Sequence, residues 1–194
     1  MPAICVYCAA SNHIDQAYFR AAEELGRAIA QRGDSLVYGG GSVGLMGEVA
    51  RAVKQHGGKV VGIIPHVLVE SEFAFTDADE LIYTDDMRSR KAQMDQRADA
   101  FVILPGGFGT MEEMFEILVG RVLRYHNKPI VILNVQGFYD PLIELMDHMY
   151  EHRFARPGTR DLYRVVSEVA QVYDAIEAQR VATMLEPSSA KVDG

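Results

Sequence analysis

The sequence has only two cysteines, Cys5 and Cys8, and lacks any hydrophobic run that approaches the roughly 20 residues of a membrane-spanning helix. Two cysteines cannot build a disulfide framework. The apolar stretch from Ala3 to Ala10 has no basic segment before it, so it fits a first β-strand better than a secretory signal. We therefore expect a protein of the reducing cytoplasm that has no membrane contact.

Positive charge is also scarce. The chain has 19 Lys and Arg residues against 27 Asp and Glu residues, which gives a net charge of -8 and a pI near 5.2. A broad basic surface for nucleic acid is therefore not expected, and any anionic ligand must be held by a local site. The remaining composition, 48% hydrophobic and 24% charged in 194 residues, is typical of one globular domain.

Short strand-like segments alternate with longer helical patterns along the chain, without an internal repeat or linker. Strands buried on both faces and separated by helices predict a single-domain, Rossmann-like α/β fold, with a doubly wound, mostly parallel sheet flanked by helices. In such sheets ligands bind outside the carboxyl ends of the strands. The expected strands are 3–8, 35–38, 59–64, 81–84, 100–104, 129–133 and 163–166, and the expected helices are 15–32, one around 45–53, 87–98, one that begins near 111, 138–150 and 168–178.

Two segments fall outside this alternation. Residues 1–180 carry the α/β pattern, whereas residues 181–194 are polar and predict a disordered tail. The other exception is the long loop 65–79, which carries Glu70 and Glu72. Long loops in compact domains are often functional, so this loop is a candidate part of a site.

Cys5 and Cys8 have the C-x-x-C spacing of some redox and metal sites. A thioredoxin-type pair lies at a helix N-terminus, where the helix dipole lowers the thiol pKa. Here the pair falls in the first predicted strand. We therefore interpret both cysteines as small buried hydrophobes.

Glycines cluster at the ends of two predicted strands, and the first cluster, Gly39 to Gly44, matches G-x-G-x-x-G. A dinucleotide site also needs a carboxylate about 20 residues on, at the end of the next strand, and that strand ends in Ile64 and Pro65. The motif also follows the second strand rather than the first. We therefore favour a tight turn with close helix packing over the site of a dinucleotide-dependent oxidoreductase.

The second cluster, Pro105 to Thr110, follows an apolar strand and precedes a helix that begins near Met111. Glycines let backbone N–H groups turn toward a ligand, and the amides of a helix N-terminus bind phosphate. The G-K-[ST] ending of a Walker loop is missing, so triphosphate chemistry is not indicated. A plain turn with Thr110 as the N-cap explains the segment equally well, and the residues alone leave both interpretations open.

Between the two clusters, Arg88, Arg90 and Lys91 bring positive charge to the start of a predicted helix. Such a charged face is usually solvated, and Asp86 is placed to pair with Arg90 one turn on. The wider sequence context gives this segment another meaning.

Five segments form a common pattern: Tyr38-Gly39-Gly40-Gly41-Ser42-Val43-Gly44-Leu45-Met46-Gly47, Met87-x-x-Arg90-Lys91, Pro105-Gly106-Gly107-Phe108-Gly109-Thr110-Met111-Glu112-Glu113, His126-x-Lys128-Pro129 and Leu133-Asn134-Val135-x-Gly137-Phe138-Tyr139. In these segments the chain resembles the LONELY GUY family of cytokinin riboside 5′-monophosphate phosphoribohydrolases, some of whose members carry an old lysine decarboxylase label. The resemblance covers about Ile4 to Ala178.

The resemblance implies that residues 1–180 form a nucleotide-binding phosphoribohydrolase domain. Such a domain hydrolyses the N-glycosidic bond of AMP or a cytokinin riboside 5′-monophosphate to a free base and ribose 5-phosphate, with no cofactor and no metal. Glu113 would stabilise an oxocarbenium-like sugar or activate water, with Arg90 as its catalytic partner. The further substrate-binding residues implied are Ser11, Gly40, Gly41, Ser42, Glu72, Met87, Lys91, Gly106, Gly107, Phe108, Gly109, Thr110, Met111 and Glu112.

Individual roles follow from the same resemblance. Arg90 would bind phosphate or ribose oxygens or orient the catalytic carboxylate, and Lys91 would add charge at the phosphate end. Glu72 corresponds to a loop glutamate that touches substrate in the family, with a solvated loop charge as the alternative. Arg88 and Val119 stand where a histidine and a threonine are common, so base specificity is expected to differ from that of the plant enzymes. The family's helices in this region also imply a homodimer.

Three other functions remain to be weighed. A carrier that binds a phosphorylated nucleotide or pterin without turnover needs the same phosphate cradle but not the carboxylate of Glu113. A zinc peptidase is suggested by His148-x-x-Glu151-His152, but this motif ends a late helix of an α/β protein, and we find no further acidic ligand from a helical domain. Lysine decarboxylase chemistry would need a lysine in a pyridoxal-phosphate setting, which the sequence does not show.

Overall fold

The structure is a computed structural model that describes residues 1–70 and 72–185. These residues form a seven-stranded sheet in the order β4-β3-β2-β1-β5-β6-β7, in which each neighbouring pair is parallel. The strands are β1 (Ala3–Tyr7), β2 (Ser35–Tyr38), β3 (Lys59–Pro65), β4 (Glu80–Thr84), β5 (Ala100–Ile103), β6 (Ile130–Leu133) and β7 (Arg164–Val166). The helices are α1 (Gln16–Gln31), α2 (Gly44–Gln55), α3 (Met87–Arg97), α4 (Phe108–Val122), α5 (Asp140–Glu151) and α6 (Val172–Leu185), with short 3-10 turns at His66–Leu68, Val135–Gly137, Pro157–Leu162 and Val169–Gln171.

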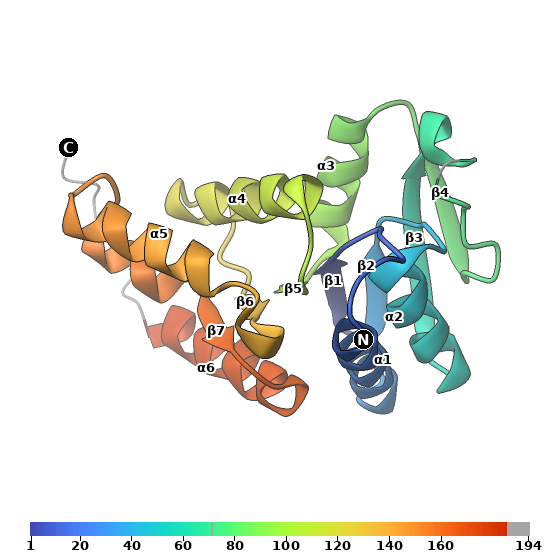
Figure 1. Cartoon of the computed structure of the whole chain (residues 1–194), viewed down its shortest axis with the longest axis horizontal. Coiled ribbons are helices and arrows are strands. Elements are labelled where there is room, and N and C mark those ends of the chain that lie inside the picture. Colours follow the sequence, from blue (N-terminus) through green and yellow to red (C-terminus); the bar gives the residue numbers. More distant parts are fainter. Residues whose placement is uncertain (71, 186–194) are drawn as a thin grey trace.

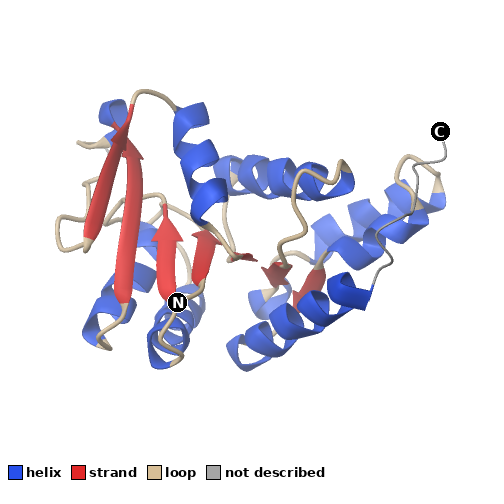
Figure 2. Ribbon diagram, turned by 180° about the vertical axis from the view of Figure 1, so that it is seen from behind, coloured by secondary structure: helices blue, strands red, loops and turns tan. Residues whose placement is uncertain are grey.

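The helices form two layers, one on each face of the sheet. Helices α1, α2 and α6 pack on one face and α3, α4 and α5 on the other (Figure 1), and Figure 2 shows the same layers from behind. The chain winds outward from β1 to β4 and then returns through α3 to β5, which lies on the other side of β1. The predicted doubly wound α/β fold is confirmed, and β1 and β5 flank the point where the winding reverses.

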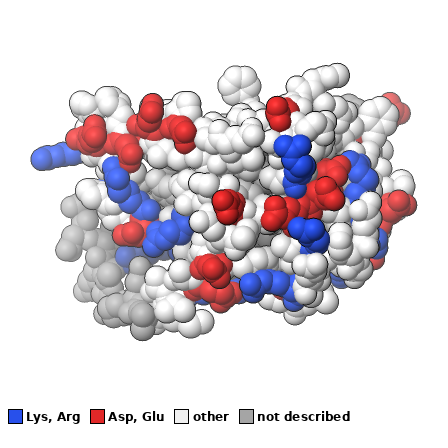
Figure 3. All heavy atoms as spheres, turned by 60° about the horizontal axis from the view of Figure 1, so that its bottom comes forward, with Lys and Arg blue, Asp and Glu red and all other residues white. Residues whose placement is uncertain are grey.

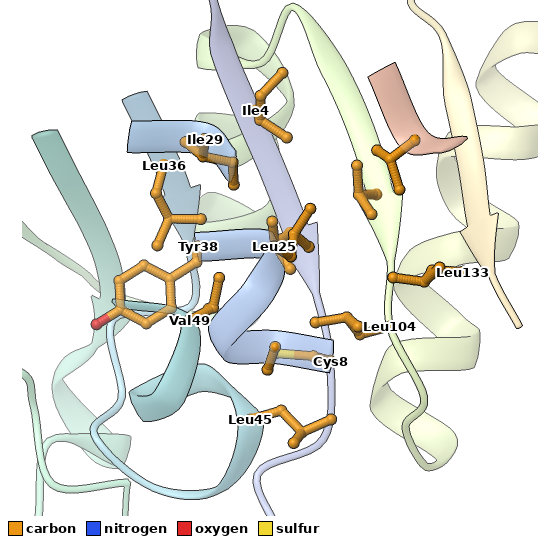
Figure 4. Packing of buried hydrophobic residues seen from close by; sticks show 14 of the residues in the cluster. Ile4, Cys8, Leu25, Ile29, Leu36, Tyr38, Leu45, Val49, Leu104 and Leu133 are labelled. Carbon is orange, nitrogen blue, oxygen red and sulfur yellow. The ribbon is translucent and has the colours of Figure 1, made fainter. Parts of the chain in front are cut away.

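The core also has two halves, because alternate residues of a strand point to opposite faces of the sheet. In β1, Ile4 and Val6 join the cluster under α1, α2 and α6, whereas Cys5 and Tyr7 join the cluster under α3, α4 and α5. Figure 4 shows the first cluster, to which α1 contributes Leu25 and Ile29, α2 contributes Leu45 and Val49, and the strands or the positions directly after them contribute Ile4, Cys8, Leu36, Tyr38, Leu104 and Leu133.

Both cysteines are buried and free of disulfide bonds. Cys5 lies within β1 and Cys8 directly after it, and burial raises the pKa of both thiols far above its ordinary value. A thiol with a raised pKa is a poor nucleophile and a poor metal ligand. The interpretation of the C-x-x-C pair as small buried hydrophobes is confirmed.

Helix α1 begins where the sequence predicts, whereas α6 extends beyond its expected end. Asp15 caps α1, since its side chain accepts a hydrogen bond from the N–H of Ala17 at 2.7 Å, so the expected start of this helix is correct. Helix α6 runs on to Leu185, so residues 181–185 belong to the last helix and not to the expected tail. The remainder of that tail, 186–194, lies outside the described residues.

Among the described helices, none is both long enough and apolar enough to cross a membrane. On the face drawn in Figure 3, acidic and basic side chains are interspersed, and no continuous basic surface is visible there. That face therefore offers a polyanion no broad electrostatic attraction.

Candidate active site

A pocket of about 310 Å³ opens at the carboxyl ends of β1 and β5, the strands between which the winding reverses. This is the position where doubly wound sheets hold their ligands. The pocket also reaches the loop after β2, the long loop after β3 and helices α2, α3 and α4. Its lining residues are Val6, Tyr7, Cys8, Ala9, Ala10, Ser11, Gly39, Met46, Glu72, Met87, Arg90, Met94, Gly107, Gly109, Thr110 and Glu113.

Arg90 is the buried positive charge of this pocket. It lies in the first turns of α3 with 4% of its surface exposed. Its Nη2 atom donates a hydrogen bond to the carbonyl oxygen of Gly39 at 2.9 Å and lies 3.4 Å from Oε2 of Glu72. Among the described residues, Nε of Arg90 has no hydrogen-bond partner. A buried donor without a partner costs folding free energy. The N–H at Nε can therefore be stabilised by a further acceptor, such as a ligand oxygen.

The expected pair between Asp86 and Arg90 is not what the structure contains. Asp86 is the N-cap of α3, and its carboxylate accepts a hydrogen bond from the N–H of Ser89 at 2.7 Å. The carboxylate of Asp86 is thus used to cap α3, and the guanidinium of Arg90 contacts Glu72 and Gly39 instead. The burial of Arg90 therefore excludes the alternative that this residue is part of a solvated helix face.

Gly39 leaves room for the guanidinium of Arg90, because it has no side chain. A Cβ atom on this glycine would lie 1.9 Å from Nη2 of Arg90, far inside contact distance. Two thioether sulfurs complete the surroundings, Met87 at 3.6 Å from Nη1 and Met46 at 4.0 Å from Nη2. The guanidinium is thus held by a carbonyl, a carboxylate and two polarizable sulfur atoms.

Glu113 is the second charged group of the pocket and comes from the second turn of α4. Burial raises its pKa to about 7, an effect that Arg90 opposes and that the carboxylates of Glu112 and Glu72 reinforce. A carboxyl group of this kind changes protonation state near neutral pH. It can therefore accept a proton from water or stabilise a developing positive charge.

Glu72 projects into the pocket from the loop after β3, and the first glycine cluster holds this loop in place. The N–H of Ser42 donates to the carbonyl oxygens of Glu72 at 3.1 Å and Phe73 at 2.9 Å, and the N–H of Phe75 donates to Gly40 at 2.8 Å. Phe73 has a φ of 49°, a left-handed conformation that is rare for a bulky residue. Burial raises the pKa of Glu72, and the charge of Arg90 opposes that rise.

The amides at the start of α2 bind protein atoms. The N–H of Gly44 donates to Oδ1 of Asn12 at 2.8 Å, and the N–H of Leu45 donates to the carbonyl oxygen of Ala9 at 2.9 Å. Residues 40–42 do not line the pocket. Apart from Gly39, which lines the pocket, the first glycine cluster is thus a tight turn that positions a loop, as the sequence favours.

The second glycine cluster presents the start of α4 to the pocket. The helix begins at Phe108, and its N-cap is Gly107, which has no side chain to cap it. The first N–H groups of a helix have no partner within the helix, so this end suits an anion. Thr110 is buried inside the first turn and is not the N-cap, contrary to the alternative left open by the sequence. A Cβ on Gly106 would lie 2.1 Å from Oγ1 of Thr110, so a larger residue at this position would clash with Thr110.

Lys91 does not line the pocket. Its Nζ atom forms ion pairs with Glu112 and Glu116, which lie one turn apart on α4. Burial works against the charge of Lys91, but these hydrogen bonds outweigh it and raise the pKa of the ammonium group. The charge of Lys91 is therefore neutralised by carboxylates of α4.

The structure divides the expected site residues into two groups. Those that line the pocket are Ser11, Glu72, Met87, Arg90, Gly107, Gly109, Thr110 and Glu113. Those that do not are Gly40, Gly41, Ser42, Lys91, Gly106, Phe108, Met111 and Glu112, of which Phe108 is 95% exposed.

Sequence reasoning missed the wall of the pocket that β1 forms. Tyr7 and Cys8 are apolar or weakly polar, so the sequence predicts them in the interior of a strand. Met46 and Met94 are predicted on the core-facing side of a helix for the same reason. A usable signal was nevertheless present, since residues directly after a central strand of a doubly wound sheet are where ligands bind.

The two alternative chemistries find little support in the geometry. The rings of His148 and His152 lie 4.2 Å apart at the end of α5, but the described residues contain no group of three or more side chains placed to hold a metal ion. The residues that line the pocket include no lysine for a pyridoxal phosphate linkage.

The fold and the pocket define a doubly wound α/β protein with a buried arginine and two carboxylates at the switch point of its sheet. The chain belongs to the family described as "Possible lysine decarboxylase", whose model matches residues 46–176.

Curated relatives carry the phosphoribohydrolase name. The "Probable cytokinin riboside 5'-monophosphate phosphoribohydrolase LOGL2" of Oryza sativa subsp. japonica is 40% identical over 174 residues, 90% of this chain and 71% of that protein. The "Cytokinin riboside 5'-monophosphate phosphoribohydrolase LOG5" of Arabidopsis thaliana is 38% identical over 177 residues, 91% of this chain and 78% of that protein. These relatives confirm the resemblance to the LONELY GUY family.

Solved structures of molybdenum cofactor proteins share the fold. The Moco carrier protein of Chlamydomonas reinhardtii has a TM-score of 0.70 at 24% identity, over 93% of this chain and 98% of that chain. The molybdenum cofactor binding protein of Rippkaea orientalis has a TM-score of 0.69 at 21% identity, over 91% of this chain and 96% of that chain. At this level of identity the likeness concerns the fold.

Proposed function

We propose that this protein is a phosphoribohydrolase that hydrolyses the N-glycosidic bond of a nucleoside 5′-monophosphate, either AMP or a cytokinin riboside 5′-monophosphate. The products are the free base and ribose 5-phosphate. The observation that carries the proposal is the meeting of Arg90, Glu72 and Glu113 in one pocket beside the open N-terminus of α4. The names of relatives about 40% identical support the same reaction.

The phosphate group fits the start of α4. Gly107 and Gly109 line the pocket there, and Thr110 adds a hydroxyl group. The partial positive charge of the helix N-terminus favours a dianion. Because no side chain caps this end, its backbone N–H groups can donate hydrogen bonds to the ligand. This end of the pocket therefore fixes the ribose 5-phosphate half of the substrate.

Glu113 supplies the chemistry at C1′ of the ribose. As the C1′–N bond breaks, its electron pair leaves with the base, and the sugar passes through an oxocarbenium-like state that a carboxylate stabilises. Water then adds its oxygen to C1′ and gives a proton to Glu113, and Glu113 returns this proton through solvent to the departing nitrogen. One nucleotide and one water thus yield one base and one ribose 5-phosphate, without a cofactor or metal.

Arg90 and Glu72 bind and orient the sugar. The ion pair between them fixes the guanidinium, whose Nε atom faces no acceptor among the described residues. A ribose hydroxyl or phosphate oxygen is an acceptor of the right kind. Met46, Met87 and Met94 give the rest of the pocket an apolar wall for the base.

Base release tests this function directly. Purified protein is incubated with AMP and with N6-isopentenyl-AMP, without added metal, and free base and ribose 5-phosphate are followed by chromatography. We expect turnover by the wild type, its loss in Glu113→Gln and Arg90→Ala, and full activity in Glu24→Gln, an exposed carboxylate on α1. No base release from any purine or pyrimidine monophosphate would contradict the proposal.

A carrier function is the second candidate, because the fold is shared with molybdenum cofactor carrier proteins. A carrier needs the phosphate cradle of α4 but not the carboxylate of Glu113. It would bind a phosphorylated ligand with unchanged affinity in Glu113→Gln and would release no base. The same samples therefore separate the two functions.

We further expect a homodimer that acts in the cytoplasm. The carboxyl-terminal half of α4 exposes Val119 and Val122, and its C-cap exposes Leu123, which together form an apolar strip that a second copy would cover. The two buried thiols suit a reducing compartment. Light scattering coupled to size-exclusion chromatography is expected to give twice the chain mass of 21.5 kDa, and Val119→Asp is expected to shift it toward the monomer.

A further inference from the structure

We infer that Lys91 is a positioning residue that clamps α3 to the first turns of α4 and so holds Arg90 opposite Glu113. This inference rests on the proposed function, because it assigns Lys91 a part in the same reaction. It also differs from the sequence-based expectation that this lysine binds the substrate phosphate.

The clamp consists of one ammonium group between two carboxylates. Nζ of Lys91 pairs with Glu112 and with Glu116, which lie on the same face of α4 because they are four residues apart. The lysine side chain is only 14% exposed, whereas the carboxylate side chains are 56% and 55% exposed. The lysine therefore bridges the two helices beneath its partners, while the outer surface of the carboxylates stays in water.

The neighbours of the clamp in sequence are the charged groups of the pocket. Arg90 precedes Lys91 on α3, and Glu113 follows Glu112 on α4. Figure 1 shows that the start of α4 lies next to α3, which crosses it steeply. A shift of one helix past the other would thus change the separation of Arg90 and Glu113.

The N-terminal end of helix α3 is anchored by Arg90, through Gly39 and Glu72, and by Lys91, through α4. Its buried side chains, within the described chain, are Arg90 and Met94. Two further ion pairs tie down its C-terminal end, Lys128 with Asp95 at 3.0 Å and Arg97 with Glu80 at 3.2 Å. A helix with so small an apolar face depends on such polar ties for its position, and Lys91 supplies the tie to α4.

The geometry does not favour a phosphate contact by Lys91. The lysine does not line the pocket, and its two partners carry more negative charge than it can neutralise. The charged and titratable groups around Glu113 are Arg90 and Lys91 from α3, Glu72 from the loop, Glu112 from α4, Cys5 and Tyr7 from β1, and Cys8 directly after β1. Removal of Lys91 leaves Glu112 unopposed, so the acidic limb of the pH–rate profile moves to higher pH.

A cycle of variants tests the clamp. Lys91→Met and the double variant Glu112→Gln with Glu116→Gln are each expected to lower kcat about tenfold to a hundredfold, since small misplacement of catalytic groups has effects of this size. The triple variant is expected to match either of them, because all three remove one interaction. Lys91→Arg is expected to restore most of kcat, and KM for AMP stays within about threefold throughout.

A phosphate contact predicts a different outcome. Lys91→Met would then raise KM and weaken AMP binding at least about tenfold with kcat nearly unchanged, and the double glutamine variant would leave KM and kcat intact. That result overturns the inference. Unchanged kinetics in Lys91→Met overturns it as well.

Hydrogen exchange provides a readout that does not depend on catalysis. Lys91→Met and the double glutamine variant are expected to speed amide exchange in the first turns of α3 equally, with thermal unfolding midpoints close to wild type. If wild type releases no base but exchange behaves in this way, the proposed function fails and the clamp stands. If wild type is active and exchange at α3 is unchanged, the clamp fails and the proposed function stands.

Discussion

The carboxyl group of Glu113 predicts a specific dependence of stability on pH. In the folded protein burial raises its pKa to about 7, against an ordinary value of 4.5. Glu113→Gln replaces the acid with a neutral group of similar shape. The variant therefore mimics the protonated state at every pH and isolates the cost of ionising this side chain in the pocket.

The sign and size of the effect follow from the two pKa values. Below pH 4.5 the group is neutral in both states, so it contributes its full stabilising effect there; as pH rises from 4.5 through 7, ionisation in the unfolded chain removes that contribution. A difference between a pKa of about 7 and 4.5 corresponds to about 3 kcal/mol above pH 7. Because Glu113 keeps some contact with water, screening reduces this to about 1 to 3 kcal/mol.

Urea unfolding at pH 5 and pH 8 measures this difference. Glu113→Gln is expected to have nearly the stability of wild type at pH 5 and to exceed it by about 1 to 3 kcal/mol at pH 8. Glu24→Gln, the exposed control on α1, is expected to match wild type at both values. An advantage of Glu113→Gln that is equal at pH 5 and pH 8 would refute the reasoning, because it could not arise from ionisation.

Three further predictions concern the frame of the pocket. Gly39→Ala is expected to lower kcat at least about tenfold, because its Cβ would lie 1.9 Å from Nη2 of Arg90 and displace the guanidinium. Tyr139→Phe is expected to reduce the free energy of unfolding by about 1 to 2 kcal/mol in urea titrations, since its buried hydroxyl donates at 2.7 Å to the carbonyl of the residue that follows β5. Cys5 and Cys8 are expected to resist a disulfide reagent in the native protein and both to react in denaturant, because burial raises the pKa of each thiol.

Gly158→Ala is a matched control for Gly39→Ala. Gly158 lies in a surface turn, and a Cβ atom on it would meet no atom of a more distant residue within 4 Å, so Gly158→Ala should leave kcat unchanged. Full activity in Gly39→Ala, unchanged stability in Tyr139→Phe, or rapid labelling of the native thiols would each contradict the packing described for the pocket.

The sequence contains most of the fold because its periodicities are strong. Ser35 to Tyr38 is a strand with the predicted bounds, and Asp15 caps the first helix at its predicted start. Two helix bounds differ from those that the sequence predicts. Helix α4 begins three residues before Met111, with Gly107 and not Thr110 as its N-cap, and α6 runs beyond its expected end at Ala178 to Leu185.

The candidate site is less visible in the sequence, because the contacts that define it join distant segments. Arg90 and Gly39 are 51 residues apart, and nothing local to Arg90 distinguishes a buried guanidinium from a solvated one. Lys91 stands beside it in the same motif, yet the two side chains point to different neighbours. Motif resemblance selects both residues, and only their contacts in the folded protein separate the one that lines the pocket from the one that does not.

The rate of base release from AMP between pH 5 and pH 9 tests the proposed function most directly. Because Glu113 must be ionised and its pKa lies at about 7, kcat/KM is expected to fall about tenfold for each pH unit below 7 and to level off above it. Glu113→Gln should show no activity across this range. Base release that is independent of pH, or the absence of base release at every pH, would contradict the assignment of Glu113 as the group that drives hydrolysis.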